Sequence, residues 1–499
     1  MRGNRSQLKK LDDMKFGTSG LRGLSVDLVE VGARAYAGAF GRYLVELGKV
    51  RTGDAILIGN DLRDSSPEIK MICATVLERL GFRVADCGTV PTPALAFYAS
   101  KLEAAGLMVT GSHIAADRNG IKFYCPNGEI NKADETAIAA LAADYRSQSD
   151  VPRDNTVLPL EDHAERCLRL FYERNARLLS GGALAGLKVG VYEHSSVARD
   201  LIAMLLLRLG ADVVPLGRSE IFIPVDTEAL SPQTIISLEE WAGSHGLDAV
   251  VSADGDGDRP LIADEMGRPL RGDLIGLMTA RFLGAKTIVT PITSNSGIEA
   301  LGFFSVIRTK VGSPFVIAAM QQASAASGDP VIGFEANGGV LTASTIDLGR
   351  YRLEALPTRD CILPILAVLS QVKSQGRPLS VVARSYHLPA AAAGRLENYP
   401  VEASTALMSY LRSFENISVF LRDVGQVTSA NDIDGLRVTL TERRTIHFRP
   451  SGNAPELRCY AEAATETAAW DLLNAGLARL RLWTNEFSKQ QAAHEDILN

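Results

Sequence analysis

A serine stands where an apolar run gives way to a polar loop in LMVTGSHIAADRNGIK, residues 107–122. The run at 107–109 predicts a buried strand, Ser112 and His113 follow it, and Lys122 comes where the chain turns apolar again. Ligands of open α/β sheets bind at the carboxyl ends of strands. Ser112 is therefore a candidate nucleophile, and the alternative is a serine that only serves the turn.

Three aspartates alternate with glycines in DGDGDR, directly after the apolar stretch LDAVVSA. Carboxylates this close repel one another unless a cation neutralises them, and oxygen-only ligands select Mg²⁺, Ca²⁺ or Mn²⁺. An EF-hand calcium loop is the alternative, because Glu265 stands at its twelfth position, but Arg259 stands where that loop needs glycine. Arg259 is expected to reach a phosphate or to balance charge. We expect a catalytic divalent metal on the three carboxylates of Asp254, Asp256 and Asp258.

Two further loops have the composition of phosphate sites. In KFGTSGLRG, residues 15–23, glycines expose backbone N–H groups and Arg22 adds a bidentate donor; a plain glycine turn is the alternative. RPSGNAPELR, residues 449–458, lies between two predicted strands. Its donors suit a phosphate monoester, although a structural hairpin would have a similar composition. The donors are Arg449, Ser451, the backbone of Gly452, and Asn453.

Glu335 and Asn337, in FEANGG, can accept from and donate to sugar hydroxyls. The alternative is a turn that leaves Glu335 in solvent. Another polar loop, GNDLRDSSPE, predicts a helix N-cap with supporting charges. Four of its residues are candidates for supporting the site without touching the substrate: Asp61, Arg63, Ser65 and Ser66.

One order of strand, helix and strand occurs three times, which indicates repeated units. The units begin at AILIGND, LKVGVYE and KTIVTPI, and continuous apolar strands joined by helices are typical of parallel sheets covered on both faces. Each unit has a later strand, and the loops at 111–120, 254–259 and 336–339 follow these strands. We expect these three loops to occupy equivalent positions. Beyond about 376, consecutive short strands and a helical tail predict a smaller α+β domain with an antiparallel sheet.

The composition is that of a globular protein with several domains: 499 residues, 46% hydrophobic and 22% charged. A net charge of −6 argues against a nucleic-acid partner. The six cysteines are scattered without a C-x-x-C pair, which is typical of free thiols in a reducing compartment. The N-terminus has no apolar signal region, and no apolar run is long enough to span a membrane. We therefore expect a cytoplasmic protein without a membrane partner.

Taken in order, FGTSGLRG, TGSH…NGIK, DGDGDR, FEANGG and RPSGNAPELR resemble the motifs of the α-D-phosphohexomutase superfamily, which includes phosphomannomutases and phosphoglucomutases. The resemblance covers nearly the whole chain. It implies three related α/β domains with mixed or parallel sheets, and a C-terminal α+β domain, around a central cleft. The domains are expected at 1–155, 156–265, 266–375 and 376–499.

The resemblance also implies roles for the residues above. Ser112 would be a phosphoserine that donates its phosphoryl group to the sugar phosphate, with Mg²⁺ held against it by the three aspartates. Glu335 and Asn337 would bind the sugar, and the loop from Arg449 to Asn453 would bind the phosphate that does not react. Cationic groups would offset the phosphoryl charge. They are Arg22, Lys122, Arg259, Lys310, Arg449 and Arg458.

The chain departs from the family pattern in three loops. The residues after His113 are Ile-Ala, where the family commonly has Asn-Pro. The sugar loop commonly reads G-E-x-S-G-H, and here Asn337 and Gly339 stand at the serine and histidine positions. Asn453 replaces a common threonine. Without that histidine, the general acid/base is one of four groups: Lys310, Arg259, Lys122 or His113.

We predict a Mg²⁺-dependent phosphohexomutase that interconverts hexose 6-phosphate and hexose 1-phosphate through a hexose 1,6-bisphosphate. Mannose is favoured over glucose as the sugar. The alternatives are a phosphoglucosamine mutase, a metal-dependent sugar-phosphate phosphatase, and a non-catalytic calcium- or sugar-binding protein. The expected partner is a small phosphosugar, and the expected state is a monomer or homodimer.

Overall fold

The computed structural model describes residues 10–11, 13–17, 20–145, 160–451 and 455–498. The chain forms two compact units. The first unit contains Met1–Val289 and Gly312–Ser385, and the second contains Thr290–Val311 and Tyr386–Asn499. Among the described residues, no helix is long and apolar enough to cross a membrane.

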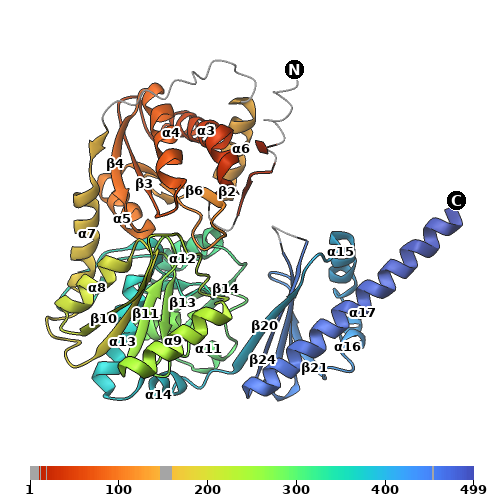
Figure 1. The fold of residues 1–499 in the computed structure, drawn as a ribbon. Helices are drawn as coiled ribbons and strands as arrows, with labels where there is room; N and C mark the ends of the chain where they lie inside the picture. Colours follow the sequence, from red (N-terminus) through yellow and green to blue (C-terminus); the bar gives the residue numbers. More distant parts are fainter. Residues whose placement is uncertain (1–9, 12, 18–19, 146–159, 452–454, 499) are drawn as a thin grey trace. The chain divides into compact units, whose positions relative to one another are not determined.

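The first unit begins with a mixed sheet in the order β1-β2-β6-β5-β3-β4-β8, with β7 beside β6. β3, β4, β5 and β8 are parallel, whereas β6 runs antiparallel to β5. Helix α3 packs against α4 and α6, and α5 packs against α7 (Figure 1). The strands are β1 (Lys15–Phe16), β2 (Leu21–Leu24), β3 (Ala55–Asn60), β4 (Arg83–Thr89), β5 (Ala105–Val109), β6 (Arg118–Cys125), β7 (Gly128–Glu129) and β8 (Glu161–Asp162). The helices are α2 (Ser25–Asp27), the π-helix Leu28–Gly32, α3 (Ala33–Glu46), α4 (Ser66–Arg79), α5 (Thr92–Leu102), α6 (Lys132–Tyr145) and α7 (Ala164–Ala176).

A second sheet of the first unit has the order β10-β9-β11-β12. β10, β9 and β11 are parallel, and β12 returns antiparallel to β11. β9 and β11 are buried along nearly their whole length, as expected for strands covered on both faces, whereas the edge strand β10 is largely exposed. The elements are β9 (Lys188–His194), α8 (Arg199–Arg208), β10 (Asp212–Arg218), α9 (Pro232–His245), β11 (Ala249–Ala253) and β12 (Pro260–Ala263).

The third sheet repeats this arrangement. β13 and β15 are parallel, β16 returns antiparallel to β15, and β19 runs antiparallel to β16. Helices α10 and α13 pack against each other beside it. The elements are α10 (Gly272–Phe282), β13 (Thr287–Pro291), α12 (Ser313–Ser327), β15 (Val331–Phe334), β16 (Val340–Thr342), β17 (Ile346–Asp347), β18 (Arg352–Leu353), β19 (Leu356–Asp360), α13 (Ile362–Gln375) and α14 (Leu379–Arg384).

The second unit has an antiparallel sheet in the order β20-β24-β23-β22-β21. The long helix α17 lies against β20 and β24 (Figure 1). The elements of this unit are α11 (Gly297–Ala300), β14 (Ser305–Thr309), β20 (Ala390–Leu396), α15 (Val401–Tyr410), α16 (Phe414–Phe420), β21 (Val427–Asn431), β22 (Leu436–Leu440), the 3₁₀ turn Thr441–Arg443, β23 (Thr445–Pro450), β24 (Leu457–Ala463) and α17 (Glu466–Leu498).

The three predicted loops do occupy equivalent positions in the repeated units. Each one connects a parallel strand of its sheet to an antiparallel return strand: β5 to β6, β11 to β12, and β15 to β16. The predicted α/β units and the antiparallel α+β unit are confirmed. The four domain boundaries stay a prediction.

Candidate functional site

Ser112 lies in the loop between β5 and β6, in a left-handed backbone conformation with φ of 54°. A non-glycine residue in this region is strained and needs support from its surroundings. Its backbone N–H donates to Thr110 Oγ1 at 2.8 Å, and Thr110 Oγ1 donates to Asp61 Oδ2 at 2.7 Å. The side chain is 2% exposed. Thr110 and Asp61 therefore fix the backbone of Ser112 in one conformation.

The side chain of Arg63 binds the backbone of the same loop. The guanidinium donates to the carbonyl oxygens of Ser112 at 3.0 Å and Ile114 at 2.6 Å, and also to those of Ala115 and Arg118. Ser65 stands at the N-cap position of α4, where the sequence predicted a cap, but its side chain makes no cap hydrogen bond. Besides beginning this helix, GNDLRDSSPE supports the serine loop through Asp61 and Arg63.

The aspartate loop approaches the serine loop directly. A Cβ atom at Gly255 would lie 2.7 Å from the Ser112 carbonyl oxygen, so this close approach requires glycine. Gly257 has a φ of 70° and turns the chain back into β12. The strands on both sides exclude the EF-hand alternative, and Glu265 instead accepts hydrogen bonds from Ser380.

The three carboxylates lie together, with one oxygen atom of each within 4.8 Å of the others. Ser112 Oγ donates to Asp254 Oδ2 at 2.5 Å. Thr92 Oγ1 donates to Asp256 Oδ2 at 2.5 Å. Asp256 Oδ1 and Asp258 Oδ1 are buried without a hydrogen-bond partner. Buried carboxylate oxygens need a donor or a cation, so this donor set fits a hard divalent cation beside the serine hydroxyl.

Three cationic side chains surround the carboxylates. Lys122 Nζ lies 2.6 Å from Asp256 Oδ2 and 2.5 Å from Asp258 Oδ2. Arg359 Nη2 lies 2.7 Å from Asp258 Oδ2, and Arg259 Nε lies 3.7 Å from Asp258 Oδ1. Burial alone would lower the pKa of Lys122, but the charges of Asp256 and Asp258 outweigh it and raise that pKa. Lys122 is therefore a fixed positive charge in this arrangement.

Two further predicted residues lie in this electropositive region. Burial, followed by the charges of Arg259 and Arg359, lowers the pKa of Arg22 to about 10. Burial and the charges of Arg259 and Arg22 depress the pKa of His113 far below its usual value. The imidazole of His113 is thus neutral, and its Nδ1 lies 3.2 Å from Ser112 Oγ. The structure therefore places all the candidate residues of the first unit's serine and aspartate loops in one cluster.

The sugar loop is a tight turn between β15 and β16. Gly338 N–H donates to the Glu335 carbonyl at 3.0 Å, and the Asn337 side chain accepts from Gly339 N–H at 3.0 Å. The turn alternative is thus correct for the backbone, but Glu335 is only 5% exposed and does not lie in solvent. Its Oε2 accepts from Ser313 Oγ at 3.1 Å and from Arg359 Nη1 at 2.8 Å.

The loop RPSGNAPELR, residues 449–458 and called the phosphate loop below, belongs to the second unit, as does Lys310. Arg449 Nε donates to Asp434 Oδ2 at 2.9 Å, and the same oxygen accepts from Val311 N–H at 2.9 Å. Ser451 N–H donates to the Glu456 carbonyl at 2.9 Å, and the exposed Lys310 precedes Val311. Within this unit, one carboxylate oxygen of Asp434 thus joins the guanidinium of Arg449 to the backbone of the residue that follows Lys310. Gly452 and Asn453 lie outside the described residues.

Arg359 is the one cationic residue of the cluster that sequence reasoning missed. It is 2% exposed and contacts both Asp258 and Glu335, which are far from it in the chain. The sequence around Arg359, LPTRD, contains no motif that indicates a functional residue and is typical of an ordinary strand end. Its burial is the signal, because arginine is almost never buried without a charged partner, and only a structure shows burial.

The chain is similar to known proteins over nearly its full length. Residues 13–149 match the family model for phosphoglucomutase/phosphomannomutase alpha/beta/alpha domain I, and residues 271–388 match that for domain III. A phosphomannomutase of Sinorhizobium fredii (strain NBRC 101917 / NGR234) is 53% identical over 467 residues, which cover 93% of this chain and 98% of the relative. A phosphomannomutase of Salmonella muenchen is 38% identical over 477 residues, covering 94% and 96%. A crystal structure of a phosphoglucomutase/phosphomannomutase family protein from Burkholderia thailandensis shares the fold, with a TM-score of 0.72 at 20% identity over 93% of this chain and 97% of that one.

Proposed function

This chain belongs to the α-D-phosphohexomutase superfamily and is a mutase of the intramolecular phosphotransferase class, and on that premise we propose that it interconverts mannose 6-phosphate and mannose 1-phosphate. The observation that carries the chemistry is the 2.5 Å hydrogen bond from Ser112 Oγ to Asp254, beside two buried carboxylate oxygens without partners. The two similar phosphomannomutases favour mannose as the sugar.

Ser112 is proposed as the phosphorylated residue. In one half-reaction, the sugar's free hydroxyl oxygen bonds to the phosphorus and the bond from phosphorus to Ser112 Oγ breaks, leaving its electron pair on Oγ. The hydroxyl proton passes to a basic side chain, for which the neutral His113 is the candidate in the first unit and Lys310 is the candidate in the second, while Lys122 stays protonated and supplies charge. The product is a hexose 1,6-bisphosphate. Its other phosphate then returns to Ser112, which restores the phosphoenzyme and completes the isomerisation.

The charges around Ser112 suit this transfer. A phosphoserine carries about −1.5 to −2 charges, and phosphoryl transfer depends on positioning and charge stabilisation. Asp254, Asp256 and Asp258 would hold Mg²⁺, which when bound neutralises phosphoryl oxygens. Arg22 and Arg259 would contact the same oxygens from the protein. Each of these roles is a proposal supported by the arrangement described above.

The remaining site residues are proposed to hold the substrate. Glu335 and Asn337 would bind the sugar hydroxyls, and Arg449, Ser451, Gly452 and Asn453 would bind the phosphate that does not react. Arginine binds phosphate through two parallel hydrogen bonds. A cytoplasmic location is proposed because all six cysteines are buried free thiols. We propose the four domains at the boundaries predicted above.

A substrate comparison tests the proposal. The enzyme is activated with a trace of hexose 1,6-bisphosphate and given mannose, glucose and glucosamine 1-phosphates, and kcat/KM is measured for each. Mannose 1-phosphate should give the highest value, and mass spectrometry should find phosphate on Ser112. Faster turnover of glucosamine 1-phosphate would favour a phosphoglucosamine mutase. Release of inorganic phosphate without isomerised sugar phosphate would show a phosphatase.

A further inference from the structure

Position 339 has no room for a side chain, because Arg359 fills the space beside it. A Cβ atom at Gly339 would lie 2.7 Å from Arg359 Cδ, 2.8 Å from Cγ and 2.9 Å from Cβ. Contacts below about 3.0 Å force something to move, and here the obstacle is the packed stem of a buried arginine. Position 339 is also where the motif of the family has a histidine. The chain thus combines an absent side chain at 339 with a cationic side chain in its place.

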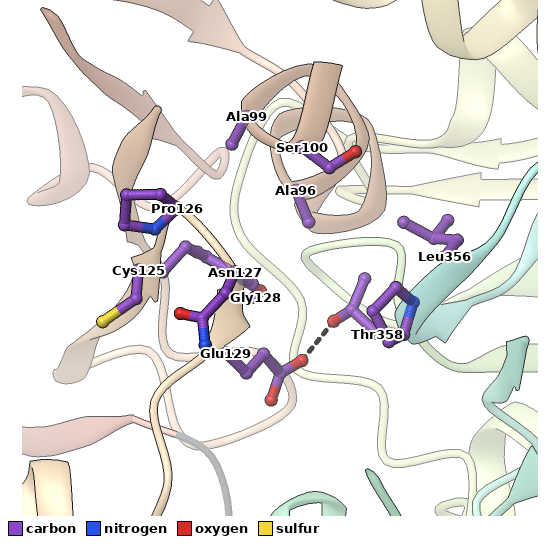
Figure 2. A pocket seen from close by; sticks show the side chains of 12 residues that line it. Ala96, Ala99, Ser100, Cys125, Pro126, Asn127, Gly128, Glu129, Leu356 and Thr358 are labelled. Carbon is purple, nitrogen blue, oxygen red and sulfur yellow. Dashed lines mark hydrogen bonds between the residues drawn. The ribbon is translucent and has the colours of Figure 1, made fainter. Parts of the chain in front are cut away.

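Arg359 is held rigidly, because its neighbours in β19 are each tied to a different part of the first unit. Thr358 Oγ1 donates to Glu129 of β7, and Figure 2 shows this bond at the edge of a cavity of about 110 Å³. Asp360 pairs with Arg174 of α7 at 3.1 Å and accepts from Ile362 N–H at 2.8 Å. A side chain between two such anchors has little freedom to move.

The guanidinium of Arg359 joins the aspartate loop to the sugar loop. Its Nη2 and Nε donate to Asp258 Oδ2 at 2.7 and 3.2 Å, and its Nη1 donates to Glu335 Oε2 at 2.8 Å. Nη1 also donates to Ser313 Oγ. A planar fork can serve two carboxylates at fixed angles, which the point charge of a lysine cannot do. One residue therefore sets the orientation of Asp258 relative to Glu335.

We propose that Arg359 is the positioning residue of this mutase, aligning the sugar-binding Glu335 with the aspartate loop from the space that a side chain at 339 would need. The inference rests on the proposed function for its role in catalysis. Because an arginine stays protonated, this position supplies charge and orientation, and proton transfer must come from elsewhere in the site.

The test begins with Arg359→Lys, which keeps the charge and removes the fork. We expect kcat to fall about 10- to 100-fold, with a smaller change in KM for the sugar phosphate, since misplacement of about 1 Å can cost this much. Mn²⁺ affinity, measured by electron paramagnetic resonance without substrate, should fall about tenfold because Asp258 loses its orienting partner. Gly339→Ala should reduce kcat in the same way, whereas Gly243→Ala, which would meet no atom within 4 Å, is the matched control.

A double variant separates positioning from a merely structural role. Arg359→Ala alone should have low kcat, and adding Gly339→His should restore kcat at least about tenfold, because the imidazole fills the vacated space beside Glu335. Normal kcat and Mn²⁺ affinity in Arg359→Lys would overturn the proposal, as would a loss fully explained by a lower Tm. A wild-type protein without mutase turnover would overturn the proposed function alone, and the Mn²⁺ titration would still decide whether Arg359 positions Asp258.

Discussion

The serine–aspartate cluster of the first unit and the phosphate loop of the second unit are built in opposite ways. In the cluster, Ser112 is 2% exposed and Asp254 is fully buried, and side chains from several strands and loops donate hydrogen bonds to the three aspartates. In the second unit, Arg449 and Ser451 are only half-buried, and Arg449 has one ion pair, with Asp434. The atoms proposed to react are thus preorganised, while the phosphate loop stays accessible. An accessible binding loop suits a substrate whose two phosphate groups must each be bound there in turn.

The largest expected effect comes from removing the hydroxyl oxygen of Ser112 from the cluster. Ser112→Ala removes the oxygen that carries the phosphoryl group, so kcat should fall by more than about 10³-fold. Coupled assays of mannose 1-phosphate turnover measure this loss, and an unchanged Tm shows that the fold is intact. Normal turnover in this variant would refute the phosphoserine mechanism.

A smaller loss is expected when the two loops of the cluster are pushed apart. In Gly255→Ala, the new methyl group would meet the Ser112 carbonyl oxygen at 2.7 Å and the Phe222 ring at 2.9 Å. We expect kcat to fall about 10- to 100-fold because Ser112 and Asp254 separate, with a loss of about 1–3 kcal/mol in the free energy of unfolding. Gly243→Ala, in α9 and without neighbours, should leave kcat unchanged. Equal kcat for the two variants would show that the close approach has no catalytic role.

A substitution in the phosphate loop should raise KM more than it lowers kcat. Arg449→Lys keeps the charge but removes the fork, so KM for mannose 1-phosphate should rise about tenfold while kcat changes little. The effect should diminish with an added anion such as sulfate, because the loop is accessible. The exposed Arg422→Lys is a suitable control. A fall in kcat with constant KM would mean that Arg449 belongs to the reacting centre.

The smallest expected effect is on stability, and it concerns a buried histidine that each region has beside its functional loop. His194 Nε2 donates to the Ala253 carbonyl at 2.8 Å, and His447 Nε2 donates to the Asp434 carbonyl at 2.7 Å. Burial lowers the pKa of each to about 4. The unfolded chain therefore binds protons first as pH falls below about 6.5, and stability is lost between about pH 6.5 and 4.

For each histidine, the free energy of unfolding should fall by about 2 kcal/mol between pH 7 and pH 5. Urea denaturation at both pH values measures this change. His194→Gln and His447→Gln should each flatten the pH dependence. An unchanged slope in His194→Gln would show that folding does not lower the pKa of this histidine.

The sequence predicted the site best where its chemistry is local. The metal site could be predicted from DGDGDR alone, since alternating aspartates and glycines specify both the negative charge and the curvature of the loop. The apolar strand before the serine loop likewise predicted the position of Ser112. Arg63 was predicted first as a charge beside a helix cap and second as a support for the site, and the turn alternative left Glu335 in solvent, because the partners of both residues are distant in the chain. Arg359 had no local pattern at all: its two carboxylate partners lie 101 and 24 residues away.

The long separations between bonded residues also have a consequence for how the protein acquires activity. The bond from Ser112 to Asp254 spans 142 residues, and the bond from Thr358 to Glu129 spans 229. Contacts between such distant residues close late during folding, after local strands and helices have formed, because closing large loops costs chain entropy. Refolding should therefore pass through a species with native-like circular dichroism and no turnover. Enzymatic activity would be the last property that the folding chain regains.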